Sequence, residues 1–175
     1  MPFGEYIPLR SVARAVGLGH FLFGEDYSSG PRWHPFEVPG WGTLGGLICM
    51  ESLFPGPSRQ LAQHGADALV TVANNAWFFQ SPAAAQHLQM TRMRAVENRR
   101  TLIQVANTGL SGIVDPFGRI TQVTDLGSRA TVHAQISLHA IRAWYTRLGD
   151  WIILASGLVI LGYLWIVRRN TTPKD

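Results

Sequence analysis

The sequence predicts an α/β fold with a mixed sheet, followed by one membrane-spanning helix. Short apolar runs alternate with helical segments over most of the chain, in the order β-α-β-α-β and then β-β-β. That order is typical of a layered α/β sandwich in which strand directions are mixed. A later stretch, Trp151 to Val167, has 17 residues without a charge, which is at the short end of what spans a bilayer.

The first clear strand runs from Thr43 to Ile48 and stops at Cys49, the single cysteine of the chain. A lone cysteine is more often a small buried hydrophobe than a catalyst, and no second cysteine is present for a disulfide within the chain. A strand that carries a thiol to its C-terminal end is also how α/β enzymes present a nucleophile. The positive N-terminal end of a following helix near Gly56 would favour the thiolate form of Cys49. The negative charge of Glu51 would oppose the thiolate, so we expect a cationic side chain nearby.

The other elements follow from apolar periodicity and turn residues. Before the nucleophile strand, Gly24 to Gly40 is rich in Gly, Pro, Ser and aromatic residues, which predicts an irregular loop. After it we predict one helix over Ser58–His64 and a second that starts at Ser81 and Pro82 and runs to about Asn98. We predict strands over Ala68–Ala73, Thr101–Ala106 and Ala130–Ile136. A hairpin is predicted over Ile113–Ile120, with its turn at Pro116–Gly118.

Composition excludes several classes of function. The chain is 46% hydrophobic and 15% charged with a net charge of +4, which describes a globular protein. No arginine-rich run alternates with aromatic residues, so we expect no nucleic-acid partner. The six histidines lack paired ligand spacing and no glycine-rich phosphate loop opens a helix, so we expect no metal, nucleotide or other cofactor.

The apolar stretch is interpreted as a membrane span because apolar residues occur all round the helix; the alternative is a buried core helix. Trp151 and Trp165 lie near its ends, where membrane interfaces favour tryptophan. Cationic residues are more numerous after the stretch (Arg168, Arg169 and Lys174) than just before it (Arg142 and Arg147). This bias favours a cytoplasmic tail and an external domain. No signal peptide begins the sequence, which leaves either a tail-anchored cytosolic protein or upstream spans outside this chain.

Six segments carry a resemblance to a known family: Pro2–Pro8 (PFGEYIP), Leu47–Glu51 (LICME), Asn74–Phe78 (NNAWF), Gln86–Glu97 (QHLQMTRMRAVE), Asn107–Gly109 (NTG) and Tyr145–Trp151 (YTRLGDW). Together they resemble the carbon–nitrogen hydrolase (nitrilase) superfamily and, within it, the membrane-bound apolipoprotein N-acyltransferases. The resemblance implies a nitrilase-like α-β-β-α sandwich, of which this chain holds the C-terminal part.

The resemblance also implies a Glu–Lys–Cys triad in which a thiolate attacks, a glutamate moves protons and a lysine stabilises the oxyanion. Cys49 matches the nucleophile, and Glu5 matches a further glutamate that organises the site. The base glutamate and the lysine belong upstream of Pro2, and Lys174 is the only lysine present. We therefore expect this chain to be the C-terminal half of a longer enzyme.

Three positions depart from the family pattern. Met50 stands where tyrosine is usual, Asn75 where aspartate is common and Phe79 where glycine is common. Met50 keeps bulk but loses a hydroxyl, which alters the positioning of an acyl chain or of the next glutamate. Asn75 removes a negative charge near the thiol, which favours the thiolate.

Several candidates have both a functional and a structural interpretation. Glu5 is either a site residue or an exposed turn residue, and Trp77 either lines the pocket or fills the core. Glu51, two residues from the thiol on an extended strand, would face the same side as Cys49. His87 is interpreted as a structural histidine with satisfied hydrogen bonds. Glu97 and the arginines around it are interpreted as a solvated helix face.

These observations favour one function and leave two alternatives. The favoured function is transfer of an acyl chain from a phospholipid to the N-terminal diacylglyceryl-cysteine of a lipoprotein, through a Cys49 thioester. Met50, Asn75 and Trp77 are then substrate-binding residues, and Glu5 and Glu51 belong to the catalytic site. The alternatives are a membrane-tethered amide hydrolase and a catalytically inactive fragment or interaction domain.

The expected organisation is a partial hydrolase domain over residues 1–148, a transmembrane helix over 149–168 and a short basic tail over 169–175. The expected location is the bacterial inner membrane with a periplasmic domain.

Overall fold

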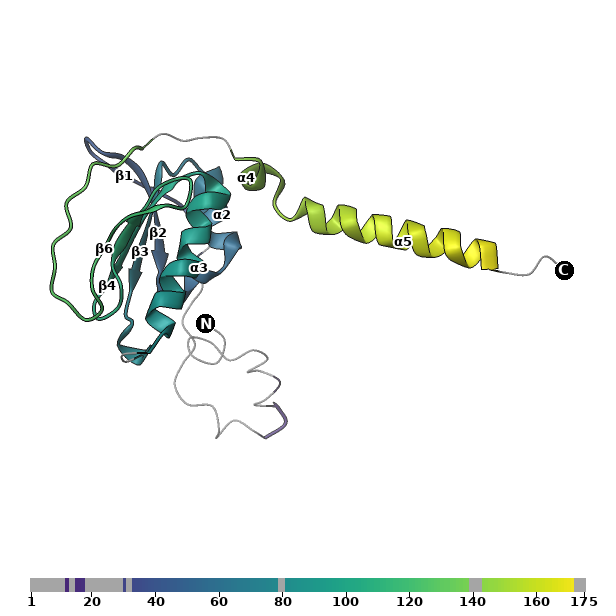
Figure 1. Ribbon diagram of the computed structural model, residues 1–175, viewed down its shortest axis with the longest axis horizontal. Helices are drawn as coiled ribbons and strands as arrows, with labels where there is room; N and C mark the ends of the chain where they lie inside the picture. Colours follow the sequence, from purple (N-terminus) through teal and green to yellow (C-terminus); the bar gives the residue numbers. More distant parts are fainter. Residues whose placement is uncertain are drawn as a thin grey trace.

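The computed structural model describes residue 12, residues 15–17, residue 30, and residues 33–78, 81–138 and 143–171, so Glu5 and Phe79 lie outside the described residues. A six-stranded sheet in the described ranges carries helices on one face, and a long helix leaves this body (Figure 1). The strands are β1 (Phe36–Val38), β2 (Gly42–Ile48), β3 (Ala68–Ala73), β4 (Thr101–Ala106), β5 (Gly112–Val114) and β6 (Ile120–Val123). The helices are η2 (Cys49–Leu53), α2 (Pro55–Gln63), η3 (Ala76–Phe78), α3 (Ala83–Asn98), α4 (Trp144–Leu148) and α5 (Trp151–Thr171), where η marks a 3-10 helix.

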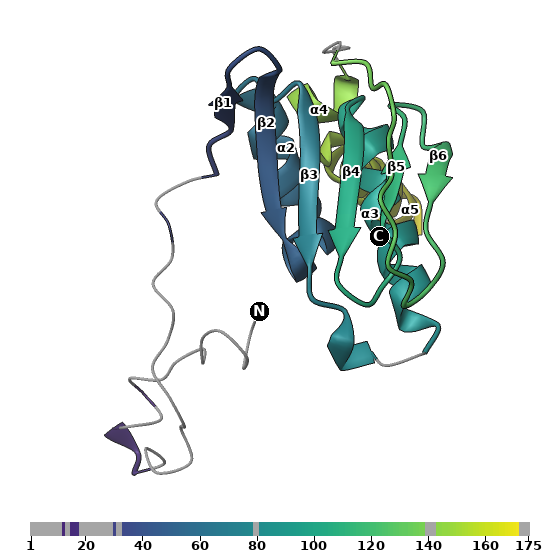
Figure 2. The same cartoon turned by 90° about the vertical axis from the view of Figure 1, so that its left-hand side faces the viewer.

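The sheet has the strand order β1-β2-β3-β4-β5-β6, and its directions are mixed as predicted. Strands β2, β3 and β4 are parallel, and α2 and α3 form the crossovers between them, whereas β1, β5 and β6 pair antiparallel to their neighbours. The carboxyl ends of the three parallel strands therefore meet at one edge of the sheet (Figure 2). In open α/β sheets this edge is where ligands bind.

Helices α2 and α3 cover one face of the sheet and enclose the core (Figure 2). Alternate strand residues point into it, since Leu47 of β2, Leu69 of β3 and Leu102 of β4 are all fully buried. Leu61 of α2 and Ala95 of α3 complete the same cluster. Each of these leucines contributes roughly 1.5–3 kcal/mol through burial, which makes this face the main source of stability.

The opposite face of the sheet presents apolar side chains in neighbouring register positions. Ile48 pairs with Val72, which pairs with Val105, and these three side chains are 67%, 51% and 49% exposed. Contiguous exposed apolar surface of this kind is typical of a site that contacts a protein, a membrane or a ligand.

Most predicted elements are confirmed by the structure. The strands Ala68–Ala73 and Thr101–Ala106 have the expected bounds, and the helix predicted over Ser58–His64 begins earlier, at Pro55. The hairpin turn is also present, where Gly118 takes a left-handed φ of 82°. The second predicted helix spans Ala83–Asn98.

Two predictions are wrong. Ala130 to Ile136 is not a strand: within it the Gln122 side chain donates to the His133 carbonyl, and just beyond it Thr101 donates to the Ser137 carbonyl. Without a backbone ladder, the apolar alternation of this segment did not specify a strand. Phe36–Val38, expected in an irregular loop, pairs antiparallel with β2 as strand β1.

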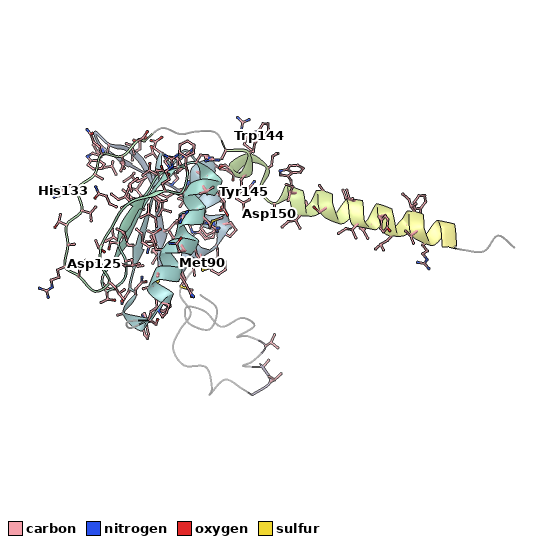
Figure 3. All side chains as sticks on the ribbon, viewed as in Figure 1. Met90, Asp125, His133, Trp144, Tyr145 and Asp150 are labelled. Atoms are coloured by element: carbon pink, nitrogen blue, oxygen red, sulfur yellow. The ribbon has the colours of Figure 1, made fainter. Side chains whose placement is uncertain are left out.

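The short helix α4 connects the sheet body to α5. Arg59 of α2 donates to the carbonyls of Tyr145 and Arg147, and Thr146 donates to the Asn98 side chain of α3 at 3.0 Å. Figure 3 shows Trp144 on the outside of α4, and its side chain is 77% exposed. Helix α4 is therefore held by its backbone and by Thr146, while its tryptophan faces away from the domain.

The apolar stretch forms a helix, as predicted. Trp151 to Arg168 is an 18-residue window with a mean hydropathy of 1.9, and none of it is buried against the domain. At about 1.5 Å per residue, 18 residues reach about 27 Å, close to the thickness of a bilayer's hydrocarbon core. By length and composition, α5 can cross a membrane, and within the described residues it is not buried as a core helix would be.

Candidate active site

Cys49 lies where β2 ends and η2 begins, at the edge where the parallel strands terminate. Its φ of 48° is left-handed, a conformation that is costly for a residue with a Cβ and that clusters at functional sites. The thiol is free and partly buried. A sharp strand-to-helix turn with a strained nucleophile at its apex is the arrangement that presents a reactive side chain above an α/β sheet.

The local geometry differs from the extended strand expected through Glu51. Cys49–Leu53 is a 3-10 helix that starts at the cysteine itself, so the helix N-terminus nearest the sulfur is η2 rather than the helix expected near Gly56. Glu51 therefore does not share a strand face with Cys49 by alternation, and that expectation is wrong. The three-residue period of the 3-10 turn replaces the two-residue period of a strand.

The Glu51 carboxylate holds the backbone that leads into the turn. Its Oε2 atom accepts a hydrogen bond of 2.7 Å from the Ile48 amide, and its Oε1 atom accepts one of 3.4 Å from Trp33 Nε1. Charge-assisted bonds of this type are stronger than neutral ones. Among the described residues, Glu51 thus fixes the backbone at Ile48, one residue before Cys49.

The ends of β3 and β4 are locked together by two asparagines beside this turn. Asn107 accepts from the Asn75 amide at 3.1 Å and donates to the Asn74 side chain at 2.8 Å. Asn74 also accepts from the Ala76 amide at 3.1 Å, which begins the short helix η3. The bonds fix the loop after β3 at the same edge as Cys49. Asn107 belongs to a motif that carried the family resemblance, but its bonding role emerges only from the structure.

The two predicted substrate-binding residues Met50 and Trp77 differ in exposure. Trp77 lies on η3 and is 81% exposed, so it does not fill the core of this chain. Met50, next to the thiol on η2, is partly buried. An exposed tryptophan and a methionine beside a thiol provide apolar contact surface at the edge of the site.

Asn75, the third predicted substrate-binding residue, lies behind the turn at Cys49. It is 1% exposed, and its Oδ1 atom lies 3.1 Å from Nδ1 of His87, which is itself 3% exposed. Its side chain therefore faces a buried polar layer. The close approach of Gly109 encloses it, because a Cβ at that glycine would overlap the Asn75 amide.

The buried polar layer consists of Ser52, Asn75, His87 and Thr91 and extends to the carbonyl of Cys49. His87 Nε2 lies 3.1 Å from Ser52 Oγ and 3.3 Å from the Cys49 carbonyl oxygen. Ser52 donates to the same carbonyl at 2.8 Å and lies 3.0 Å from Thr91 Oγ1. Burial lowers the pKa of His87, and the hydrogen bond to the Cys49 backbone partly opposes that shift.

These contacts confirm that His87 is a structural histidine with bonded ring nitrogens, as expected. Ser52 and Thr91 were not anticipated as part of the site. Their signal in the sequence is spacing: Ser52 lies three residues after the cysteine, and His87 and Thr91 lie one helical turn apart. Small polar residues at such positions are too common for the spacing alone to identify them.

Comparison with known proteins identifies the family of this chain. The family model described as carbon–nitrogen hydrolase matches residues 9–146. The chain is similar to proteins named apolipoprotein N-acyltransferase from Azotobacter vinelandii (35% identity, 97% of this chain and 33% of that protein), Geobacter metallireducens (36%, 91% and 31%) and Pseudomonas aeruginosa (37%, 100% and 34%). It thus spans about a third of the length of these curated relatives.

Solved structures support the fold. A carbon–nitrogen hydrolase from Helicobacter pylori superposes with a TM-score of 0.58 at 17% identity, over 65% of this chain and 46% of that chain. Saccharomyces cerevisiae Nit3, a member of the nitrilase superfamily, superposes with a TM-score of 0.50 at 24% identity, over 58% and 40%. At these identities the likeness concerns the fold alone.

Proposed function

We propose, since this chain belongs to the carbon–nitrogen hydrolase family, that it forms the C-terminal part of an apolipoprotein N-acyltransferase with Cys49 as its nucleophile. The observation that carries the proposal is the strained turn at Cys49, at the carboxyl ends of three parallel strands. The similarity to curated N-acyltransferases along nearly the whole chain supports the choice of reaction.

The proposed reaction has two steps through one covalent intermediate. The Cys49 thiolate attacks an ester carbonyl of a phospholipid, a C–S bond forms, the C–O bond breaks and a lysophospholipid leaves with a proton. The α-amino group of a lipoprotein's diacylglyceryl-cysteine then attacks the thioester. An amide forms, the amine loses a proton and the thiol is restored. Each step is an acyl transfer, so no redox partner or metal is required.

The acid–base and oxyanion groups are assigned by the family resemblance. A base glutamate and a lysine would come from residues outside this chain, since its only lysine follows α5. Glu5 would organise the site, and Glu51 would hold the strand end at Ile48. Preorganised donors at the developing oxyanion supply the largest share of stabilisation in such reactions.

The exposed sheet face is proposed to pack against a second sheet in the whole protein. Ile48, Val72 and Val105 form an apolar row on that face. A second sheet would complete the α-β-β-α sandwich implied by the family and bury these side chains. Residues 1–148 would then be part of one hydrolase domain.

Helix α5 is proposed to anchor the domain in the bacterial inner membrane. The span expected over 149–168 begins two residues before the helix, which runs from Trp151 to Thr171, so the helix includes the first residues of the basic tail expected over 169–175. Trp151 and Trp165 near its ends suit the two interfaces. The cationic residues after the span favour a cytoplasmic tail and a periplasmic domain. A phospholipid substrate is then available at the surface beside the domain.

Mass spectrometry of the whole protein tests the proposal. After incubation with a phospholipid that carries an isotopically labelled acyl chain, Cys49 is expected to gain the acyl mass and to lose it with hydroxylamine. Addition of a diacylglyceryl peptide with a free amine should move the label to that peptide. Cys49→Ala should abolish labelling, and Cys49→Ser, a near-isosteric control, should reduce it strongly because an alcohol is the weaker nucleophile.

Two outcomes would contradict the assignment. Labelling that persists in Cys49→Ala would exclude the thiol mechanism. Release of free fatty acid at the same rate with and without the acceptor amine would favour an amide or ester hydrolase in place of a transferase.

A further inference from the structure

A strained backbone at Cys49 requires support from its surroundings. A non-glycine residue at φ 48° costs of the order of 1–3 kcal/mol and persists only when neighbouring groups determine it. The Cys49 carbonyl belongs to the peptide unit immediately after the strained φ. The groups that bind this carbonyl are therefore in a position to hold the turn.

Two buried side chains lie within hydrogen-bond distance of that carbonyl. Ser52 Oγ donates to it at 2.8 Å, and His87 Nε2 lies 3.3 Å from it. A carbonyl oxygen can only accept, so this contact is a hydrogen bond in the tautomer that carries the His87 proton on Nε2. That proton is also within reach of Ser52 Oγ, at 3.1 Å. The imidazole thus bridges the carbonyl of the nucleophile and the serine one 3-10 turn later.

The other ring nitrogen is held by Asn75. With Nε2 protonated, a neutral ring accepts at Nδ1, so Asn75 must present its amide nitrogen there. In the orientation described, Asn75 Oδ1 faces His87, and Asn75 Nδ2 is buried with no hydrogen-bond partner among the residues that the structure describes. A half-turn of the amide provides the donor for the ring. The nitrogen and oxygen of such an amide occupy nearly the same volume, so the turn needs no repacking.

The helix that carries His87 is fixed independently of the site. Leu88 and Ala95 of α3 are buried in the core, and Asn98 at its end bonds to Thr146. Thr91 donates to the His87 carbonyl at 2.8 Å and lies against Ser52. Helix α3 is therefore a rigid support from which the imidazole reaches the turn.

We propose that His87 is a positioning residue for Cys49, whose ring, oriented by Asn75, maintains the left-handed turn that presents the sulfur. This inference adds a role for His87 to the proposed role of Cys49. Only the expected effect of His87 on acyl transfer rests on the proposed function. Its effect on the turn itself can be measured without any substrate.

Hydrogen exchange on the intact protein in detergent tests the structural part. In His87→Ala, amides of the Cys49–Leu53 turn should exchange about tenfold faster or more, because opening then loses the bonds to the Cys49 carbonyl. His87→Gln should restore most of the protection, because its amide nitrogen can donate to that carbonyl. Thr101→Ala changes an equally buried polar residue at the start of β4, the end of the strand away from Cys49; it is the matched control and should leave the turn unchanged.

The rate of thioester formation on Cys49 should follow the same order: reduced about tenfold or more in His87→Ala and restored in His87→Gln, as expected when a nucleophile is misplaced. Unchanged exchange of the turn in His87→Ala would overturn the inference, and so would a His87→Gln variant as impaired as His87→Ala. If the wild-type protein forms no thioester while the turn still depends on His87, the proposed function fails and the positioning role stands.

Discussion

Arg94 and Glu97 of α3 form an ion pair in which Arg94 Nη2 donates to Glu97 Oε1 at 2.7 Å, with side chains only 9% and 20% exposed. The interpretation of this helix face as solvated is therefore wrong. Arg94 Nη1 also donates to the Leu53 carbonyl at 3.1 Å, at the end of the turn that begins at Cys49. Burial raises the pKa of Glu97, and the Arg94 guanidinium opposes that shift.

Arg94→Met is expected to destabilise the protein by about 3 kcal/mol, because it leaves the Glu97 carboxylate buried without its partner. Thermal unfolding of the variant in detergent measures the effect. The double variant Arg94→Met with Glu97→Met should recover part of the loss. Arg119→Met, which changes an arginine that is 80% exposed and lies 4.0 Å from Asp115, is the control and should shift stability by about 0.5 kcal/mol or less. Equal effects of the two single variants would contradict a buried pair.

Stability should depend on pH through His87. Because burial lowers its pKa in the folded protein, the unfolded chain takes up the proton first as pH falls through about 6.5. The contribution of neutral His87 to the free energy of unfolding is complete above that pH. It is lost as pH falls through the lowered pKa of His87 in the folded protein. Glu97 acts in the opposite sense, since its raised pKa favours the folded state as pH falls towards 4.5.

Denaturant titrations between pH 5 and 8 on the wild type and on His87→Gln isolate the histidine contribution from that of Glu97. The difference in unfolding free energy between the two proteins should shrink as pH falls below about 6.5. Parallel curves for the two proteins would show that His87 has an ordinary pKa.

Gly109→Ala should destabilise the protein by about 1–3 kcal/mol, because its methyl group would overlap the Asn75 side-chain amide in a packed layer. The matched control is Gly56→Ala, where an added Cβ meets no atom within 4 Å. Thermal unfolding should separate the two variants by several degrees. A Gly109→Ala protein as stable as Gly56→Ala would mean that Asn75 has room to move.

Leu158→Arg places a charge near the middle of α5, where the side chain is 71% exposed to its surroundings. If α5 spans a membrane, this charge should reduce membrane insertion by about 2.5–3.5 kcal/mol. The fraction of protein that resists carbonate extraction from membranes measures insertion. Leu158→Ala is the control, and an unchanged fraction for Leu158→Arg would argue against a membrane span.

The elements that the sequence predicted correctly are those whose signal is local. Ala68–Ala73 and Thr101–Ala106 are buried parallel strands, so an apolar run bounded by polar residues marks both ends. The long helix up to Asn98 has a proline near its start, and α5 has an uncharged, largely apolar stretch from Trp151 to Val167. The strand predicted over Ala130–Ile136 failed because β-propensity depends on a pairing partner that the sequence does not name.

The candidate site divides in the same way. Cys49 was predicted as the nucleophile from its place at the end of an apolar run, and Glu5 as a site residue from a motif outside the described residues; both roles stay predictions. The bond from the Ile48 amide to Glu51 was not predictable, because it depends on the 3-10 turn replacing an extended strand. The layer of Ser52, His87 and Asn75 was equally hidden, since its members come from three separate segments.

By itself the sequence determined the strand that ends in a thiol, the two crossover helices and the apolar C-terminal helix, because each depends on residues adjacent along the chain. Only the tertiary structure decided that Cys49 adopts a left-handed turn and that His87 and Ser52 meet its carbonyl. Contacts between residues 35 or more positions apart depend on how strands and helices pack, and packing is a property of the folded chain as a whole.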